Sequence, residues 1–159
     1  MIDEKLLDKV SSLLKKQRLT IATAESCTGG LIAHTLTNVS GSSDYFDRGI
    51  ISYSNNAKIK LLDVPEELIK KYGAVSEQVA KAMADGVRKK SNVDIGIATT
   101  GIAGPTGGTP SKPVGLVYIG VSNSDNTFVK KYLFTGNRLE NKEQACNEGL
   151  LLLYDYLKK

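Results

Sequence analysis

The chain has 159 residues, 41% of them hydrophobic and 24% charged, with a formal net charge of +4. This length and composition are typical of one globular domain, so we expect residues 1–159 to fold as a unit. The lysines are scattered, aromatic residues make up only 6% of the chain, and no apolar run reaches the roughly 18 residues of a membrane span, so we expect neither a nucleic acid nor a membrane as partner.

The first half of the chain alternates between helical and strand patterns. Apolar residues recur at helical spacing in the first segment, and a short β-prone run follows it. We expect helices at residues 3–17, 30–36 and 55–62, and strands at residues 19–23 and 48–53. Pro65 suits the first turn of a further helix, and Ser76 suits the N-cap of the helix after that.

The second half of the chain predicts a strand, a long loop, a hairpin and a final helix. Residues 93–99 alternate in the manner of a strand and lead into a Gly/Pro-rich loop at 101–115. We expect a β-hairpin of residues 114–121 and 127–134, and a helix over 139–157. Strands that alternate with helices and then pair as a hairpin predict an α/β fold. The architecture that we expect is a three-layer α/β/α domain with a mixed, mostly parallel sheet and a C-terminal hairpin and helix.

The cysteines and the N-terminus indicate the compartment. Only two cysteines are present, Cys27 and Cys146, far apart in the sequence, which is not the pattern of a small secreted disulfide scaffold. Residues 1–5 lack the features of a signal peptide. We therefore expect a cytoplasmic protein, whose apolar final helix would suit assembly into a homo-oligomer.

Three clusters of small and polar residues are candidate sites: residues 25–30, 53–58 and 99–108. The first falls between a predicted strand and a predicted helix, where backbone N–H groups have no partner within the helix. Such a turn could hold a phosphate or a developing oxyanion. A turn that binds no ligand is the simpler alternative.

Ser26 and Cys27 are the candidate nucleophiles of the first cluster, and each needs a base. The only histidine, His34, falls two turns into the following helix and points away from Cys27. A lysine with a lowered pKa can serve a serine instead. Lys58 follows a strand end and shares a helix face with Ser54, but its spacing does not distinguish it from the other lysines.

The third cluster resembles a phosphate-binding loop but fits neither standard pattern. Gly101 and Gly104 do not form a G-x-G-x-x-G motif, and no P-loop glycine precedes Lys112. We therefore expect no ATP or NAD site, although a loop at a strand end lies where open α/β sheets bind ligands. With one histidine and no close cysteine pair, we also expect no metal and no cofactor.

Six sequence blocks together resemble the C-terminal domain of the competence/damage-inducible protein CinA. They are residues 24–33, 41–43, 53–55 with 57–58, 73–76, 100–105 and 112–115. Stand-alone members of that family are nicotinamide-nucleotide amidases. The resemblance implies an α/β fold and a small-molecule nucleotide substrate, nicotinamide mononucleotide, which is hydrolysed to nicotinate mononucleotide and ammonia.

The same resemblance implies a serine–lysine mechanism. Ser26 matches the family's nucleophile, Lys58 its base, and Tyr53 a tyrosine that assists. We expect backbone N–H groups near Thr28 to Gly30, or that of Gly101, to hold the oxyanion. The expected substrate-binding residues are Thr28, Gly29, Gly30, Thr100, Gly101, Gly104 and Arg138.

Two positions near the C-terminus depart from the family pattern. Asn137 stands where the family has an acid, and Lys142 stands for a second arginine. A lysine keeps the charge of an arginine but loses its bidentate fork. If that arginine grips the substrate's phosphate, the change affects affinity or specificity and leaves the catalytic residues intact.

Two alternative functions use the same residues. The first is a non-catalytic module that binds a phosphate ligand or another protein. The second is an amidase for a different carboxamide. Ser26, Tyr53 and Lys58 together favour an enzyme over a binding module, because binding alone needs no activated nucleophile.

Overall fold

Five strands form one mixed sheet in the computed structural model, which describes residues 1–159. The strands are β1 (Ile21–Glu25), β2 (Phe46–Ile51), β3 (Ile95–Gly101), β4 (Leu116–Ser122) and β5 (Thr127–Leu133). Their order across the sheet is β2-β1-β3-β4-β5. β1 pairs in parallel with β2 and β3, whereas β4 runs antiparallel to both β3 and β5.

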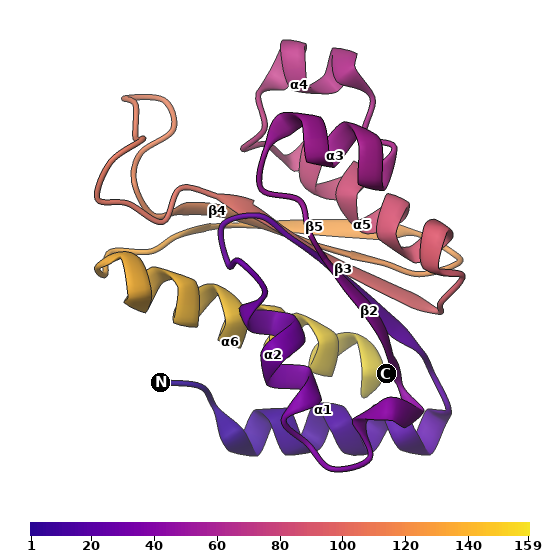
Figure 1. The fold of residues 1–159 in the computed structure, drawn as a ribbon. Helices are drawn as coiled ribbons and strands as arrows, with labels where there is room; N and C mark the ends of the chain where they lie inside the picture. The colour runs from indigo at the N-terminus through magenta and orange to yellow at the C-terminus, as the bar shows by residue number, and fades with distance from the viewer.

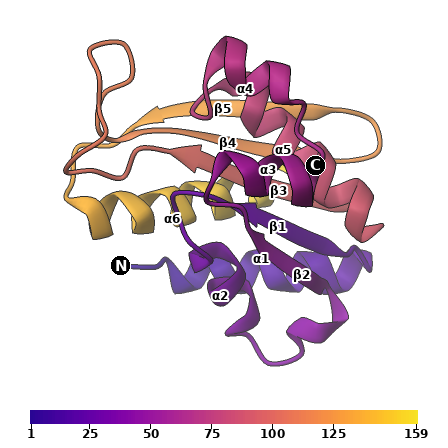
Figure 2. The same ribbon diagram turned by 45° about the horizontal axis from the view of Figure 1, so that its top comes forward.

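Six α-helices and one short 3-10 helix, η1 (Ser42–Asp44), complete the fold. One side of the sheet carries α1 (Glu4–Gln17), α2 (Leu31–Thr37) and α6 (Arg138–Leu157), as Figure 1 shows. The other side carries α3 (Asn55–Leu62), α4 (Glu66–Tyr72) and α5 (Glu77–Ser91). The same three layers are visible after a 45° rotation (Figure 2). The predicted three-layer α/β/α class is therefore confirmed.

Most predicted elements lie within a few residues of the observed ones. The helix at 55–62 has the predicted bounds, and Ser76 caps α5 by accepting from the N–H of Val79. The strand expected at 48–53 lies two residues earlier, because Ser54 caps α3 and the chain leaves the sheet before it. The pairings divide evenly between parallel and antiparallel, because the C-terminal hairpin contributes both antiparallel ones.

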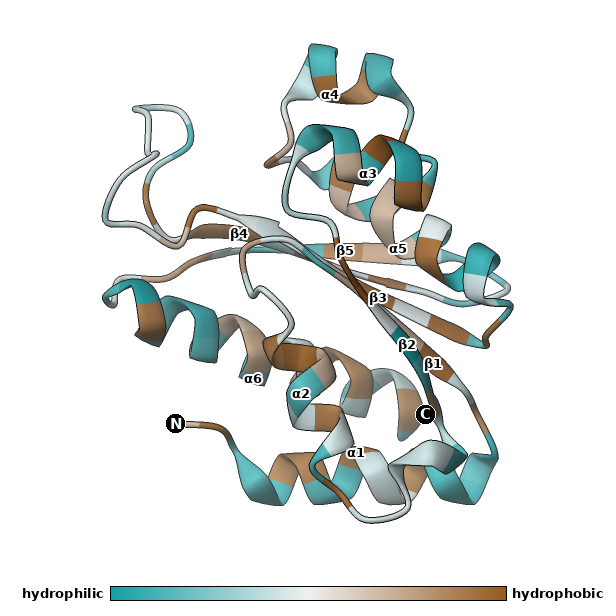
Figure 3. Cartoon of the chain, in the orientation of Figure 1, coloured by the Kyte–Doolittle hydropathy of each residue, from teal (hydrophilic) through white to brown (hydrophobic).

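The two faces of the sheet carry side chains of different size. Ile21, Ile95 and Ile97 pack in the core under α1 and α6, and the hydrophobic residues of the strands and inner helix faces are visible in Figure 3. Towards α5 the strands present Ala22, Ala24 and other small residues. These small residues let α5 approach the sheet backbone closely, since packing in protein interiors leaves few voids.

Gly96 on β3 marks the closest approach of α5, which gives a stability prediction. A Cβ at Gly96 would lie 2.3 Å from the carbonyl oxygen of Ala84, a backbone atom that cannot rotate away. We expect Gly96→Ala to lower the free energy of unfolding by about 1–3 kcal/mol, as overpacking does. Gly120→Ala, whose Cβ would lie 3.0 Å from the Ala80 oxygen, should cost less in the same urea titration. Equal losses would contradict this order.

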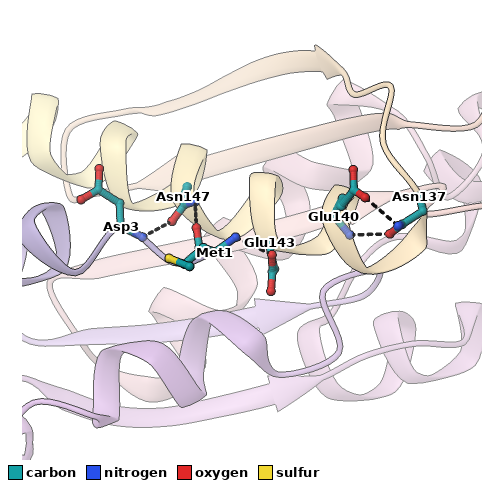
Figure 4. Close-up of polar contacts among 6 residues, drawn as sticks. All are labelled: Met1, Asp3, Asn137, Glu140, Glu143 and Asn147. Carbon is teal, nitrogen blue, oxygen red and sulfur yellow. Dashed lines mark hydrogen bonds and ion pairs between the residues drawn. The ribbon is translucent and has the colours of Figure 1, made fainter.

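The N-terminal segment is tied to α6, which also carries part of the site described below. The ammonium of Met1 forms an ion pair with Glu143, and Asn147 accepts from the N–H of Asp3 (Figure 4). Asn137 caps the start of α6. None of the helices combines the length and apolar character needed to cross a membrane.

Candidate active site

A pocket of about 190 Å³ opens where β1 and β3 end. Ser26 directly follows β1, and its N–H donates to the carbonyl oxygen of Thr99 at 3.0 Å, so the β3 ladder holds the residue in place. This edge, at the carboxyl ends of parallel strands, is where open α/β sheets place ligands. The pocket is lined by Ser26, Cys27, Tyr53, Asn55, Lys58, Ala74, Val75, Thr100, Gly101, Ala103 and Arg138.

Lys58 is a buried lysine whose side-chain nitrogen contacts the Ser26 hydroxyl. Its Nζ lies 3.1 Å from Ser26 Oγ, 2.9 Å from the carbonyl oxygen of Ser52 and 3.0 Å from that of Tyr53. The side chain is only 1% exposed, and none of the ion pairs in the structure involves it. Burial lowers the pKa of Lys58 below that of an ordinary lysine, and the neighbouring Cys27 opposes this to a smaller extent.

These contacts orient the neutral form of the lysine. Carbonyl oxygens accept hydrogen bonds and cannot donate them, so the oxygens of Ser52 and Tyr53 take the two N–H groups of a neutral amine. The lone pair is then left for the hydroxyl of Ser26. The arrangement can therefore take the proton of that serine, which is the requirement for an activated nucleophile.

The position of Lys58 depends on how α3 packs against α5. Lys58 and Leu62 are the buried residues of α3, one turn apart. A Cβ at Gly86 of α5 would lie 2.0 Å from the carbonyl oxygen of Leu62, so only glycine allows the two helices to approach this closely. Ser54 caps the first turn of α3 by accepting from Ala57. The lysine therefore reaches Ser26 from a helix that is fixed at both ends.

Glu25 holds the turn that carries Ser26. Its carboxylate is 1% exposed and accepts from Thr28 Oγ1 at 2.6 Å and from the N–H groups of Ile32 and Ala33 at 2.8 and 3.0 Å. These are first-turn amides of α2, whose positive end favours an anion. The anion at this helix is thus the chain's own carboxylate, where the sequence suggested a phosphate or an oxyanion.

We expect Glu25→Gln to destabilise the protein by about 1–3 kcal/mol, because the amide places an N–H₂ group among buried donors. The displaced turn should also shift Ser26 relative to Lys58. Urea unfolding measures the first effect, with Glu77→Gln as control, since Glu77 lies exposed in the first turn of α5. Equal stability of the two variants would show that the Glu25 charge does not hold the turn.

Tyr53 and Arg138 lie together at the mouth of the pocket. Tyr53 is 59% exposed, and its hydroxyl accepts from Arg138 Nη2 at 3.1 Å. Arg138 Nη1 donates to the carbonyl oxygen of Gly104 at 2.7 Å. The backbone oxygen of Tyr53 therefore accepts from Lys58, while the Tyr53 hydroxyl accepts from Arg138.

Thr100 is buried at the pocket wall. Its Oγ1 donates to the carbonyl oxygen of Ala74 at 2.8 Å, which joins the end of β3 to the segment before α5. The lone pairs of this oxygen remain able to accept from a ligand. Thr100 and Gly101 thus join Ser26, Lys58, Tyr53 and Arg138 in one pocket, which brings together six of the ten residues expected at the site.

The other four expected residues lie outside this pocket. Thr28, Gly29 and Gly30 line a neighbouring pocket of about 380 Å³. Gly104 contacts the site only through the bond from Arg138 to its carbonyl oxygen. The neighbouring pocket is completed by Leu31, His34, Leu139, Lys142 and Glu143.

Cys27 is not chemically activated, although it lies beside Ser26. Its side chain belongs to the hydrophobic core under α6. Burial raises the pKa of its thiol to about 12, and the hydrogen bonds and the Lys58 charge that act in the opposite direction are smaller effects. The thiol therefore stays protonated at neutral pH, whereas only a thiolate is a strong nucleophile.

Nowhere in the structure do three or more His, Cys, Asp or Glu side chains gather in a group able to hold a metal ion.

Sequence reasoning missed several residues at the site. Asn55, Ala74, Val75 and Ala103 line the pocket, and Glu25 holds the turn that carries Ser26. Glu25 carried a signal: it is a charged residue that follows a run of apolar and small residues in a predicted buried strand. The other four lie in the blocks that resemble the CinA family, at residues 53–55, 73–76 and 100–105, but their residue types and spacing alone do not indicate a shared pocket.

Comparison with known proteins identifies the family. The profile of the CinA C-terminal domain matches residues 3–157. The chain belongs to the CinA C-terminal domain family. This CinA-family chain is 53% identical over 157 residues to a "CinA-like protein" of Kosmotoga olearia, and 47% identical over 155 residues to a "Putative competence-damage inducible protein" of Thermoanaerobacter pseudethanolicus. Those matches cover 99% and 98% of this chain but only 37% and 38% of the relatives, so the chain spans less than two-fifths of their length.

Solved CinA-family structures share the whole fold. The competence/damage inducible protein CihA of Agrobacterium tumefaciens superimposes with a TM-score of 0.95 at 36% identity, covering 100% of this chain and 99% of that one. A CinA superfamily protein of Escherichia coli gives 0.88 at 31% identity, covering 96% and 92%. The similarity to the Agrobacterium tumefaciens structure therefore extends over every element that forms the pocket.

Proposed function

We propose that the chain is an amidohydrolase that uses Ser26 as nucleophile and Lys58 as base. The contact of Lys58 Nζ with Ser26 Oγ at 3.1 Å, inside a pocket, is the observation that carries this proposal. A purely structural lysine would gain from a carboxylate partner or from solvent. Lys58 has neither, and it faces a hydroxyl at the sheet edge where ligands bind.

The reaction proceeds through an acyl-enzyme. Neutral Lys58 takes the proton of Ser26 as Oγ attacks the carboxamide carbon, which gives a tetrahedral intermediate with an oxyanion. The C–N bond breaks, and the leaving nitrogen takes the proton from Lys58 and departs as ammonia. Water then attacks the ester, giving one proton to Lys58. That proton returns to Ser26 as the carboxylic acid is released.

We propose nicotinamide mononucleotide as the substrate. The family resemblance suggests it, and the shape of the site supports a ligand of two parts. The Ser26 pocket, at about 190 Å³, is smaller than the roughly 300 Å³ and above of most ligand sites, so it suits the pyridine carboxamide alone. An adjoining pocket of about 500 Å³ shares Ala103 and Arg138 with it. The Arg138 cation between the two would attract the phosphate of a nucleotide.

A substrate panel tests the proposal. Ammonia release would be measured with nicotinamide mononucleotide, free nicotinamide and unrelated carboxamides, while binding is followed by thermal shift. We expect ammonia from the mononucleotide and little from free nicotinamide. A thermal shift with the mononucleotide but no ammonia would favour the binding module. Faster release from another carboxamide would keep the amidase and replace the substrate.

A further inference from the structure

The ladder between β1 and β3 fixes where the main-chain N–H groups of β3 point. The N–H of Ile95 donates to the oxygen of Thr20, and the N–H of Ser26 donates to the oxygen of Thr99. Odd-numbered residues of β3 therefore direct their N–H groups towards β1. The N–H of Ile102 donates to Leu116 at the start of β4, which shows that even-numbered residues point the other way.

The next position of this ladder lacks its hydrogen bond. Continuation of the pattern would join the N–H of Gly101 to the carbonyl oxygen of Ser26. That oxygen instead accepts from the N–H of Gly29 at 3.1 Å, because the chain turns towards α2. The N–H of Gly101 is left without an acceptor, directed at the turn that carries the Ser26 hydroxyl, and Gly101 lines the pocket.

Several other donors near Ser26 are already used, whereas the N–H groups of Cys27 and Thr28 in the same turn also lack a main-chain acceptor. The N–H of Ser26 is bonded to Thr99, and that of Gly29 to Ser26. The amides of Ile32 and Ala33 at the start of α2 are bonded to Glu25. Gly101 is half-buried at the pocket wall, so its unpaired N–H is a donor that a bound ligand can use.

We propose that the N–H of Gly101 stabilises the oxyanion formed when Ser26 attacks a carboxamide, which rests on the function proposed above. As Oγ bonds to the carboxamide carbon, the carbonyl oxygen takes up the negative charge. A donor fixed by a β-sheet needs no rearrangement to meet that charge, which is the condition for strong stabilisation. Glycine is required here for a separate reason, since a Cβ would lie 2.7 Å from the Leu116 oxygen.

An amide-to-ester replacement at Gly101 tests the proposal. Glycolic acid incorporated at position 101 replaces the N–H by an oxygen and adds no side chain. Because this N–H has no bond in the unliganded protein, the melting temperature and KM should stay close to wild type. We expect kcat for ammonia release to fall by about 10²–10³-fold, as for other single oxyanion donors. The matched control is the same replacement at Gly107, an exposed loop glycine. An unchanged kcat for the Gly101 ester, with active wild type, would overturn the proposal and leave the amidase intact.

A boronic acid gives a second readout that does not depend on turnover. The boron of pyridine-3-boronic acid accepts a lone pair of Ser26 Oγ, whose proton passes to Lys58, and a tetrahedral anionic adduct forms. We expect the Gly101 amide proton to move downfield in the ¹⁵N–¹H spectrum of this adduct, and the Gly107 amide to stay in place. An adduct that leaves the Gly101 resonance unmoved would overturn the proposal. If neither adduct nor ammonia forms, the proposed function fails and the role of Gly101 falls with it.

Discussion

Ser26→Ala should lower kcat for ammonia release from nicotinamide mononucleotide by at least about 10³-fold, because loss of a nucleophile removes the covalent route. The serine Oγ is the one hydroxyl in contact with Lys58 Nζ. The variant should fold normally, since Ser26 is held by its backbone N–H and not by its hydroxyl. Ammonia release under single-turnover conditions gives the rate, and circular dichroism checks the fold.

Cys27→Ala is the matched control, one residue away in the same turn. We expect its kcat to remain close to wild type, because the Cys27 thiol is buried and protonated. Its stability should fall slightly through lost packing in the core under α6. Full activity of Ser26→Ala together with an inactive Cys27→Ala would assign the nucleophile to the cysteine.

Lys58→Met should separate activity from stability. We expect kcat to fall by about 10²–10⁴-fold, the usual contribution of a general base. The melting temperature should change little or rise at neutral pH, since methionine fills a similar volume and removes a buried amine whose charged form has no carboxylate partner. Thermal unfolding and ammonia release on one preparation measure both. A drop in both would mean that the hydrogen bonds from Lys58 to the oxygens of Ser52 and Tyr53 stabilise the fold.

The same lysine predicts how activity and stability depend on pH. Burial lowers the pKa of Lys58 in the folded state from the 10.5 of an ordinary lysine, so kcat should rise with pH through the lowered value and then level off. At pH values between the lowered pKa of Lys58 in the folded state and its ordinary pKa in the unfolded state, the unfolded chain binds more protons than the folded one. The free energy of unfolding due to this group therefore increases with pH over that interval. Lys58→Met should remove this contribution, which urea titrations at several pH values would detect.

The sequence was sufficient for the layers of the fold because those depend on local patterns. The helix at 55–62 was predicted with its observed bounds, and Ser76 was recognised as a cap from its residue type. The strand at 46–51 was displaced because its end is set by the cap of the next helix and not by its own apolar residues. Local information thus places elements well and their ends less well.

The candidate site could be predicted only in part. Ser26 stood out because it lies in a strand-to-helix turn, but Lys58 was singled out by family resemblance. Its contact with Ser26 depends on the approach of α3 to α5 at Gly86, a contact between distant residues. Glu25 was harder still, because a filled helix end becomes visible only in the folded chain. Gly101 was among the expected site residues, and its N–H was one of two alternatives for the oxyanion, but its missing ladder bond becomes visible only when the strands are in register.

The distribution of the pocket over the chain also bears on when the protein becomes reactive as it folds. Ser26 is anchored by the oxygen of Thr99, and the pocket mouth needs Arg138 from α6. Contacts between residues so far apart form late, because a long loop must close first. A chain still emerging from the ribosome has the serine and the lysine but no β3 to align them. Reactivity towards a boronic acid would therefore report on completed folding, since partly folded chains contain both residues without the site.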